Sequence, residues 1–285
     1  MKIIVKLKGG LGNQMFQYAF GKEISLLTNR ELILDLSSLI EENPNIVKRD
    51  FDLTIFNING YQVVDSFDEP CEKFFEDWYP EIWGVEYFNI IKEKILSSVH
   101  NNVYIDGYWQ TPILFSEKFE PLVDFSFKNS IINFSEPISK DIKNCNSVMV
   151  NVRRKDFVDN NFHGCYGVDF IKKSIDFLQS EEKNLHFFIF SDDIDWCEKN
   201  LSFIENSTVI GHSHSGEKFG NYLQLMTQCK HFILPNSTFA FWAAFISQNI
   251  NKKIVRPKIW FKYQNLECDF LFETLNYNKI DCIFN

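Results

Sequence analysis

The second half of the chain alternates between short apolar runs and longer segments whose apolar residues recur at helical spacing. The run His186–Phe190 is apolar at nearly every position, which is typical of a strand buried on both faces of a parallel sheet. We expect strands at 147–152, 185–190, 208–211, 231–234 and 253–256, alternating with helices at 168–179, 193–201, 218–229 and 238–248. Strands that alternate with helices in this way predict a Rossmann-like domain.

The first half opens with a similar strand, loop and helix. Residues Lys2–Leu7 predict a strand and Lys8–Gly12 a tight loop, and the apolar spacing beyond predicts a helix from Asn13. We expect further strands at 31–35 and 103–109. The segment 40–98 is rich in aromatic, acidic and asparagine residues, so we expect irregular structure with short helices there.

Composition limits the classes of protein that the chain can represent. A length of 285 residues with 45% apolar content suits one large domain or two of ordinary size. The formal net charge of -9 argues against nonspecific nucleic-acid binding and mildly against docking on anionic lipid. Any anion-binding site must therefore be local.

No targeting or membrane segment is expected. The longest apolar stretch, Phe232–Ile246, is shorter than the roughly 20 residues of a membrane span and is interrupted by the turn Asn236–Thr238. The first residues predict a strand and not a signal peptide, which indicates a cytoplasmic protein. Seven cysteines, odd in number, scattered and without a C-x-x-C pair, predict reduced and mostly buried thiols.

Three polar clusters each follow a predicted strand of the second half: Arg153–Asp156, Ser191–Asp193 and Asn236–Thr238. Ligands of open α/β sheets bind beyond the carboxyl ends of the strands, so the three clusters can converge on one ligand. Paired guanidinium groups at such an end form a rigid fork that suits phosphate. The sequence therefore predicts an anion site in this half.

Each cluster also has a structural interpretation. The arginines can belong to a salt-bridge site between domains in which Asp156 neutralises Arg154. Ser191–Asp193 can cap the next helix, and we expect one of these residues to cap it while another faces the ligand. Asn236–Thr238 can hold a phosphate at the helix N-terminus or act only as a cap.

The loop Gly9–Gln14 resembles a dinucleotide-binding loop, but the pattern G-x-G-x-x-G fails at Met15. It can let a sugar or a phosphate approach backbone amides, or it can be a plain turn with Asn13 as the helix cap. Tyr108-Trp109 can stack on a sugar, although core packing is the favoured interpretation of Trp109.

A short acidic pattern, D-x-D, occurs twice, at Asp50-Phe51-Asp52 and at Asp193-Ile194-Asp195. Many metal-dependent glycosyltransferases hold a divalent ion with this pattern. A three-residue acidic pattern arises easily by chance, and Asp195 lies inside a predicted helix. We therefore expect no metal site.

Four segments together resemble, in the family's order, the bacterial alpha-1,2-fucosyltransferases of glycosyltransferase family 11. The segments are Gly9–Ala19, Gly107–Gln110, Phe188–Cys197 and Asn236–Ala244. The resemblance covers residues 1 to about 260. In the family hallmark H-x-R-R-x-D, Arg153, Arg154 and Asp156 match, whereas Asn151 replaces the histidine and Lys155 the usual glycine.

The resemblance implies a GT-B-like α/β architecture of two Rossmann-like domains that face each other across a cleft. We expect an acceptor-side domain at 1–140, a nucleotide-sugar-binding domain at 141–262, and a segment 263–285 that packs back on the N-terminal domain. The implied donor is GDP-fucose, and the implied reaction is an inverting transfer to the 2-hydroxyl of a galactose in an oligosaccharide or surface-polysaccharide acceptor. No metal or other cofactor is implied, and membrane contact is at most peripheral.

Roles follow from the chemistry of that transfer. Charge accumulates on the leaving diphosphate, so we expect Arg154 to be its principal ligand, with Arg153 either sharing it or orienting Asp156. Asp156 is the first candidate for the base, although a carboxylate beside arginine is a weak one, and Asp159 and His163 are alternatives. The other residues expected at the donor are Gly10, Gly12, Asn13 and Gln14 at the sugar, with Asn13 taken as catalytic; Ser191, Asp192 and Asp193 at guanine or ribose; and Asn236, Ser237, Thr238 and Phe239 at phosphate.

Two rival hypotheses stay open. Asn151 and Lys155 depart from the family pattern at the donor site, which leaves room for a transferase that uses a different nucleotide sugar. A noncatalytic protein that binds a sugar or a nucleotide on the same fold is the other alternative. Oligomeric state is not predicted.

Overall fold

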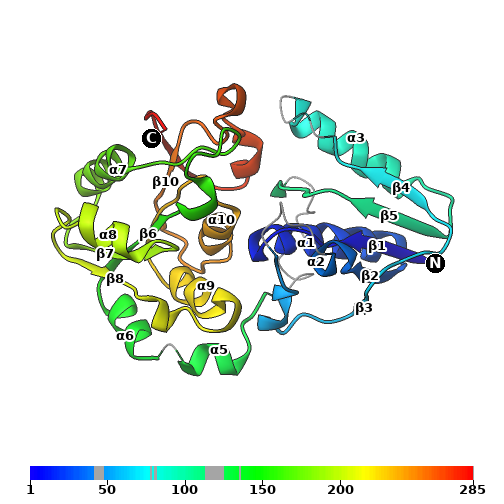
Figure 1. Ribbon diagram of the computed structural model, residues 1–285, viewed down its shortest axis with the longest axis horizontal. Coiled ribbons are helices and arrows are strands. Elements are labelled where there is room, and N and C mark those ends of the chain that lie inside the picture. Colours follow the sequence, from blue (N-terminus) through cyan, green and yellow to red (C-terminus); the bar gives the residue numbers. More distant parts are fainter. Residues whose placement is uncertain (42–47, 78, 80–81, 113–124, 135, 285) are drawn as a thin grey trace. The chain divides into compact units, whose positions relative to one another are not determined.

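The computed structural model describes residues 1–41, 48–77, 79, 82–112, 125–134 and 136–284. The chain divides into two α/β units (Figure 1). Unit 1 comprises Met1–Phe127 and Asp269–Thr274, and unit 2 comprises Lys128–Cys268 and Leu275–Asn285. The division thus falls earlier than the boundary at residue 140 that we expected, and only part of the segment 263–285 groups with unit 1.

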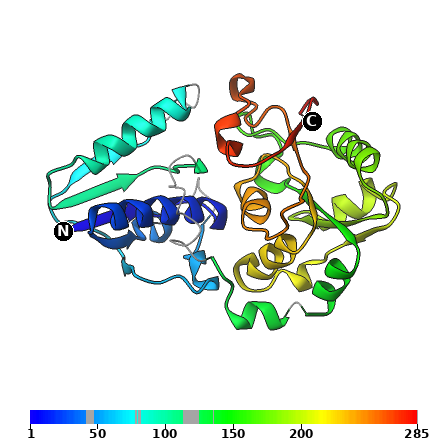
Figure 2. The same ribbon diagram turned by 180° about the vertical axis from the view of Figure 1, so that it is seen from behind.

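Unit 1 contains a parallel sheet of five strands in the order β3-β2-β1-β5-β4. Its strands are β1 (Lys2–Lys6), β2 (Glu31–Asp35), β3 (Gln62–Val64), β4 (Glu72–Phe75) and β5 (Asn102–Asp106). Its helices are α1 (Leu11–Thr28), α2 (Ser37–Ile40) and α3 (Val85–Leu96). Helix α1, drawn in dark blue, runs along β1 and β2 in both views (Figures 1 and 2). On the sheet, Ile4, Ile33 and Tyr104 form a cluster that the β3–β4 connection covers with Phe67 and Cys71.

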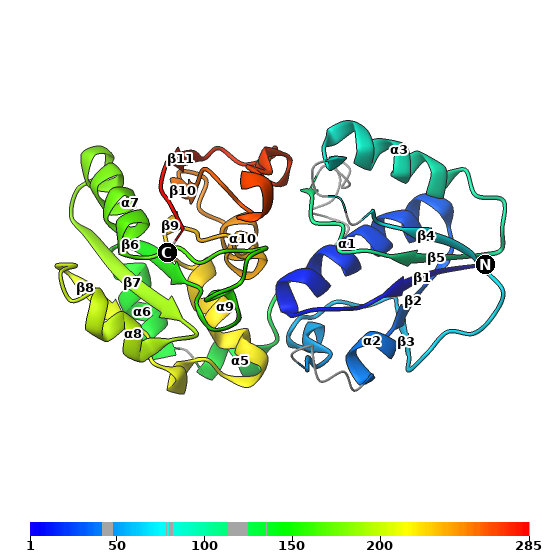
Figure 3. The same ribbon diagram turned by 45° about the horizontal axis from the view of Figure 1, so that its top comes forward.

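Unit 2 contains a parallel sheet of six strands in the order β11-β10-β9-β6-β7-β8 (Figure 3). The strands are β6 (Asn146–Val152), β7 (Leu185–Ser191), β8 (Ser207–Val209), β9 (His231–Ile233), β10 (Ile254–Pro257) and β11 (Asn278–Ile280). The helices are α5 (Asn129–Phe134), α6 (Glu136–Asn144), α7 (Val168–Glu181), α8 (Ile194–Asn200), α9 (Gly220–Thr227) and α10 (Thr238–Phe245). The parallel sheet predicted for this half is confirmed.

Apolar side chains project from both faces of the unit 2 sheet, as expected for a parallel sheet that helices cover on both sides. Val148 and Val150 of β6 join a core with Phe170 of α7 and Cys197 of α8. On the other face, the ring centroids of Phe190 on β7 and Tyr222 on α9 are 5.5 Å apart. Helices therefore cover both faces, and the sheet positions the loops at its carboxyl edge rigidly.

Three local predictions are wrong. The segment 40–98 holds two edge strands and the helix α3, which buries only Phe88 and Ile95 and so shows little apolar periodicity. The strand expected at 103–109 ends at Asp106. Helix α1 begins at Leu11 with Gly10 as its N-cap, so Asn13 does not cap it. The favoured interpretation of Trp109 is confirmed, because the side chain is fully buried.

Candidate functional site

At the carboxyl ends of β6 and β7, two arginines hydrogen-bond to the same aspartate. Arg153 and Arg154 directly follow β6, and Asp192 directly follows β7, its neighbour in the sheet. Asp192 Oδ2 accepts a hydrogen bond from Arg153 Nη1 at 2.6 Å, and Asp192 Oδ1 accepts one from the backbone N–H of Arg154 at 2.9 Å. Asp192 therefore anchors the two-arginine cluster to the sheet.

The guanidinium group of Arg154 is held from two sides. Its Nε donates to Asp193 Oδ2 at 3.2 Å, and its Cζ lies over the Trp196 ring, 4.2 Å from the ring centre. Within the part of the chain that the structure describes, its Nη2 makes no hydrogen bond. A guanidinium that is stacked, paired at one edge and open at another is preorganised to receive a planar pair of anionic oxygens.

Asp156 pairs with Arg153 Nη2, not with Arg154. Arg154 pairs instead with Asp193, so the alternative interpretation in which Asp156 neutralises Arg154 is wrong in its partner. The Asp156 side chain is 36% exposed, against 11% for Asp192. Of the two carboxylates that pair with Arg153, Asp156 is thus the more exposed to solvent.

The expectation for Ser191–Asp193, that one residue caps the next helix, is confirmed. Asp193 Oδ1 accepts a hydrogen bond from the backbone of Trp196 at the start of α8. Ser191 Oγ donates to Val152 O and accepts from the backbone N–H of Asp193, which ties β7 to β6. Ser191, Asp192 and Asp193 thus all make hydrogen bonds within unit 2. A contact of any of them with guanine or ribose stays a prediction.

Asn236 ties together three loops at the same edge of the sheet. It lies between β9 and α10, is 4% exposed, and its Nδ2 donates to the backbone carbonyls of His163, Gly164 and Trp260 at 2.8, 3.3 and 3.0 Å. Asn236 thus positions the loops, whereas the N-terminus of α10 next to it has no side-chain cap. The neighbouring Ser237 is buried, and Thr238 and Phe239 are half-buried.

His163, an alternative candidate for the base, is poorly suited to that role. Burial lowers the pKa of its imidazole to about 4, so the ring binds a proton weakly at neutral pH. The ring stacks on Phe157 with a centroid distance of 4.5 Å. Phe157 in turn lies 5.1 Å from the Arg153 guanidinium, so this aromatic pair supports the arginine.

In unit 1, the first turns of α1 hold the loops at the carboxyl edge of its sheet. Gln14 Nε2 donates to Gly9 O and Asp50 O, and its Oε1 accepts the backbone N–H of Asp52 at 2.9 Å. Asn13 Oδ1 accepts a hydrogen bond from Gln110 Nε2 at 2.9 Å. Gln14 is therefore engaged by backbone groups, and its predicted contact with the donor would have to replace one of these bonds.

The glycines of this loop have different surroundings. A side chain at Gly9, where φ is +75°, would collide with Asn13. Gly10 lies beside Arg49, whose Cζ would be 3.9 Å from a Cβ at that position. Gly12 is buried in the first turn of α1. Arg49 was missed by the sequence interpretation, because no motif or strand marks it.

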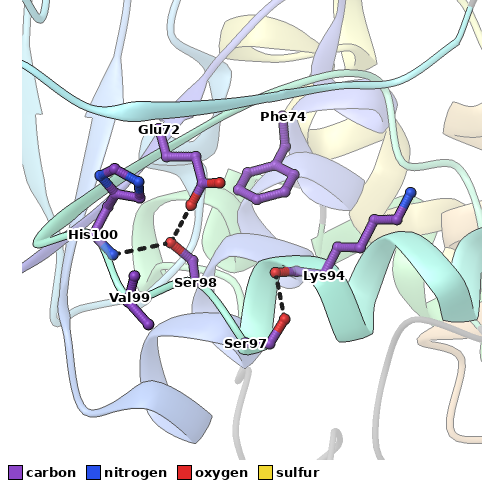
Figure 4. A pocket seen from close by; sticks show the side chains of 7 residues that line it. All are labelled: Glu72, Phe74, Lys94, Ser97, Ser98, Val99 and His100. Carbon is purple, nitrogen blue, oxygen red and sulfur yellow. Dashed lines mark hydrogen bonds between the residues drawn. The ribbon is translucent and has the colours of Figure 1, made fainter.

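Charged residues at the ends of β1 and β5 were missed too. Lys8 Nζ pairs with Asp106 Oδ1 at 2.7 Å and lies 4.8 Å from the ring centre of Tyr108. For Lys8 the signal was present in the sequence, since it directly follows the predicted strand Lys2–Leu7, whereas Asp106 lay inside the strand predicted at 103–109. A pocket elsewhere in unit 1, lined by Glu72, Ser98 and neighbouring residues, lies instead at the start of β4 and β5 (Figure 4).

Among the described residues, no group of three or more histidine, cysteine, aspartate or glutamate side chains is arranged to hold a metal ion. No helix in the described ranges is long and apolar enough to cross a membrane. All seven cysteines are described, and each is a free thiol.

Comparison with known proteins shows the family of this chain. Residues 2–265 match the sequence profile of glycosyl transferase family 11. An alpha-1,2-colitosyltransferase of Escherichia coli is 30% identical over 284 residues, which cover 93% of this chain and 94% of that protein. The chain belongs to glycosyltransferase family 11. The family resemblance of the four sequence motifs is thereby confirmed.

Other relatives of this family 11 chain are more distant. Galactoside alpha-(1,2)-fucosyltransferase 1 of Rattus norvegicus is 30% identical over 104 residues, 35% of this chain and 28% of that protein. The crystal structure of fucosyltransferase NodZ from Bradyrhizobium superposes with a TM-score of 0.54 at 15% identity, over 85% of this chain and 91% of that one. The fold is therefore the GT-B-like α/β fold, with one parallel sheet in each unit.

Proposed function

We propose that the protein transfers fucose from GDP-fucose to the 2-hydroxyl of a galactose in an oligosaccharide or surface-polysaccharide acceptor, with inversion and without a metal. The observation that carries this proposal is the pair Arg153 and Arg154, which a shared carboxylate anchors at the carboxyl edge of the unit 2 sheet. Membership of family 11 supports it, as do the names of relatives that form alpha-1,2 linkages. A crystal structure of NodZ alpha-1,6-fucosyltransferase, which shares the fold, was obtained from a crystal soaked with GDP-fucose.

In this reaction the acceptor oxygen forms a bond to C1 of fucose while the bond from C1 to the phosphate oxygen breaks. GDP leaves with the electron pair, and the proton of the 2-hydroxyl passes to a base, for which Asp156 is the candidate. Negative charge develops on the leaving diphosphate, so fixed positive charge there stabilises the transition state more than the ground state. Arg154 supplies that charge, and Arg153 shares it while holding Asp156.

A colitosyl donor is the second candidate, because a colitosyltransferase matches nearly the whole chain. Colitose is fucose without its 3-hydroxyl group. A donor site that hydrogen-bonds this hydroxyl would reject colitose strongly, whereas an apolar site would discriminate weakly.

The deciding experiment offers GDP-fucose, the corresponding colitosyl nucleotide and a UDP-sugar, each with a galactose-terminated acceptor and a chelator. We expect nucleotide release from GDP-fucose and an alpha-1,2-linked product by NMR. Faster transfer of colitose than of fucose would mean that the donor is the colitosyl nucleotide, and the proposed reaction type would stand. Absence of transfer from every donor would favour the noncatalytic alternative, and a strict metal requirement would point back to Asp193-Ile194-Asp195.

Asp192→Asn tests the anchor of the two arginines. The amide keeps one oxygen acceptor but loses the charged bond to Arg153, so we expect GDP to bind about tenfold more weakly. Asp195→Asn is the matched control, because it removes the same charge from the exposed side of α8 and should change GDP affinity less than about twofold. Equal affinities for the Asp192 variant and the unmodified protein, measured by calorimetry, would show that the anchor does not matter for the donor.

A further inference from the structure

Glu76 joins two strand ends of unit 1 through its buried side chain. It directly follows β4 and is 7% exposed. One carboxylate oxygen accepts the backbone N–H of Tyr108 at 2.6 Å, and the other accepts that of Trp109 at 3.0 Å. Its own backbone N–H donates to Asp106 O at 3.0 Å, so Glu76 fastens the start of the loop that follows β5.

This loop, Gly107–Gln110, has a conformation that it would not adopt alone. Trp109 has φ +53°, in the left-handed region that bulky residues avoid. A Cβ at Gly107 would lie 2.5 Å from Glu76 Cβ and 2.6 Å from the Trp109 ring. Surrounding contacts must therefore hold the loop in place, and the carboxylate of Glu76 supplies two of them.

The same loop carries side chains to the carboxyl edge of the unit 1 sheet. Tyr108 lies against Lys8, with Nζ 4.8 Å from the ring centre. Gln110 Nε2 donates to Asn13 Oδ1 at 2.9 Å. A shift of the loop would move both Tyr108 and the partner of Asn13.

We propose that Glu76 is a positioning residue of the transferase, whose ionised carboxylate holds Gly107–Gln110 so that Gln110 orients the side chain of Asn13. The inference rests on the proposed function and on the expectation from the sequence that Asn13 is catalytic. An ionised carboxylate accepts both backbone N–H groups, whereas a protonated one turns a hydroxyl toward one of them. Protonation therefore releases part of the loop.

Burial raises the pKa of Glu76 to about 7, against the opposite effect of the two backbone N–H groups. The charged or titratable groups that face it from the neighbouring elements are Lys8, Tyr87, Asp106 and Tyr108. Lys8 favours the ionised form and Asp106 the neutral form. Glu76 therefore changes its protonation state near neutral pH.

The pH dependence of stability runs opposite to that of activity. The pKa of Glu76 is higher in the folded protein than its ordinary value of 4.5, so the folded state binds the proton more tightly than the unfolded chain does. As pH falls from about 7 toward 4.5, Glu76 thus adds to the free energy of unfolding while its hold on the loop weakens. For a glutamate with a purely structural role, activity would not fall while the free energy of unfolding rises.

The test compares Glu76→Gln with the unmodified protein in a pH profile of kcat/KM for the acceptor. We expect kcat/KM of the unmodified protein to fall about tenfold below pH 7 without loss of thermal stability. Glu76→Gln should be about tenfold slower at pH 8 and should lack this acid limb. Glu72→Gln is the control, since Glu72 lies on the same strand at its far end, in the pocket of Figure 4, and should keep the limb. An unchanged acid limb in Glu76→Gln would overturn the proposal.

Hydrogen exchange of the Tyr108 and Trp109 amides tests the same inference without an activity assay. Corrected for the intrinsic pH dependence of exchange, their protection should fall about tenfold between pH 8 and pH 6 in the unmodified protein and stay constant in Glu76→Gln. Constant protection in the unmodified protein would overturn the role of Glu76. Failure of the transferase proposal would appear instead as an absence of transfer from every donor, with the exchange result unaffected.

Discussion

Replacing Arg154 with alanine is expected to lower kcat/KM for GDP-fucose by about a hundredfold or more. Loss of a fixed positive charge at a developing phosphate anion costs about 3 kcal/mol of transition-state stabilisation. Arg154 is the better placed of the two arginines, because Trp196 and Asp193 hold its guanidinium and one edge of it is open. Arg154→Lys should recover only part of the rate, because an ammonium group keeps the charge but not the two-pronged geometry.

The control for charge alone is Lys155→Ala. Lys155 is adjacent to Arg154 in sequence, but its side chain is exposed. Loss of this cation should change kcat/KM by less than about twofold. Steady-state kinetics at fixed ionic strength, with thermal melting to verify folding, separates the cases. Equal losses in the lysine and arginine variants would mean that net charge, and not the arginine geometry, drives donor use.

Asp156→Asn is expected to lower kcat by about a hundredfold while GDP affinity changes less than about threefold. A base contributes to the chemical step and not to binding of the leaving nucleotide, which is the reason for the split. The measurement is kcat from steady-state kinetics beside the GDP dissociation constant from calorimetry. A variant with normal kcat and weakened GDP binding would instead show that Asp156 braces Arg153, the contact that the structure contains.

Asp159→Asn is the matched control for that prediction. Asp159 lies three residues farther along the same loop, is exposed and has φ +60°, a conformation that asparagine adopts readily. We expect this variant to keep its kcat within about twofold. If it lost activity while Asp156→Asn kept it, the base would be Asp159.

The sequence predicted the unit 2 sheet well because its strands are apolar on nearly every residue, which is the pattern of full burial. Unit 1 was harder. Its strands β3 and β4 lie at the two edges of the sheet and consist of exposed and half-buried residues, and α3 buries only two side chains. No continuous apolar run marks such elements, so the segment 40–98 was taken as irregular.

For the candidate site, strand ends and residue chemistry were enough to group Arg153, Arg154 and Asp192. Which carboxylate pairs with which guanidinium depends on the turn after β6, and the alternative interpretation that joined Asp156 to Arg154 was wrong, because Asp156 pairs with Arg153. Glu76 could not be singled out, because its significance comes from two backbone N–H groups more than thirty residues away in the sequence. Hydrogen bonds to the backbone leave no sequence pattern.

Calorimetric titration of GDP, in the presence of a chelator, tests most directly whether the arginine pair holds the donor diphosphate. We predict that GDP binds to the unmodified protein and to Lys155→Ala with equal affinity, and at least about tenfold more weakly to Arg154→Ala. Binding of GDP to Arg154→Ala as tight as to the unmodified protein would contradict the assignment of the diphosphate to this site.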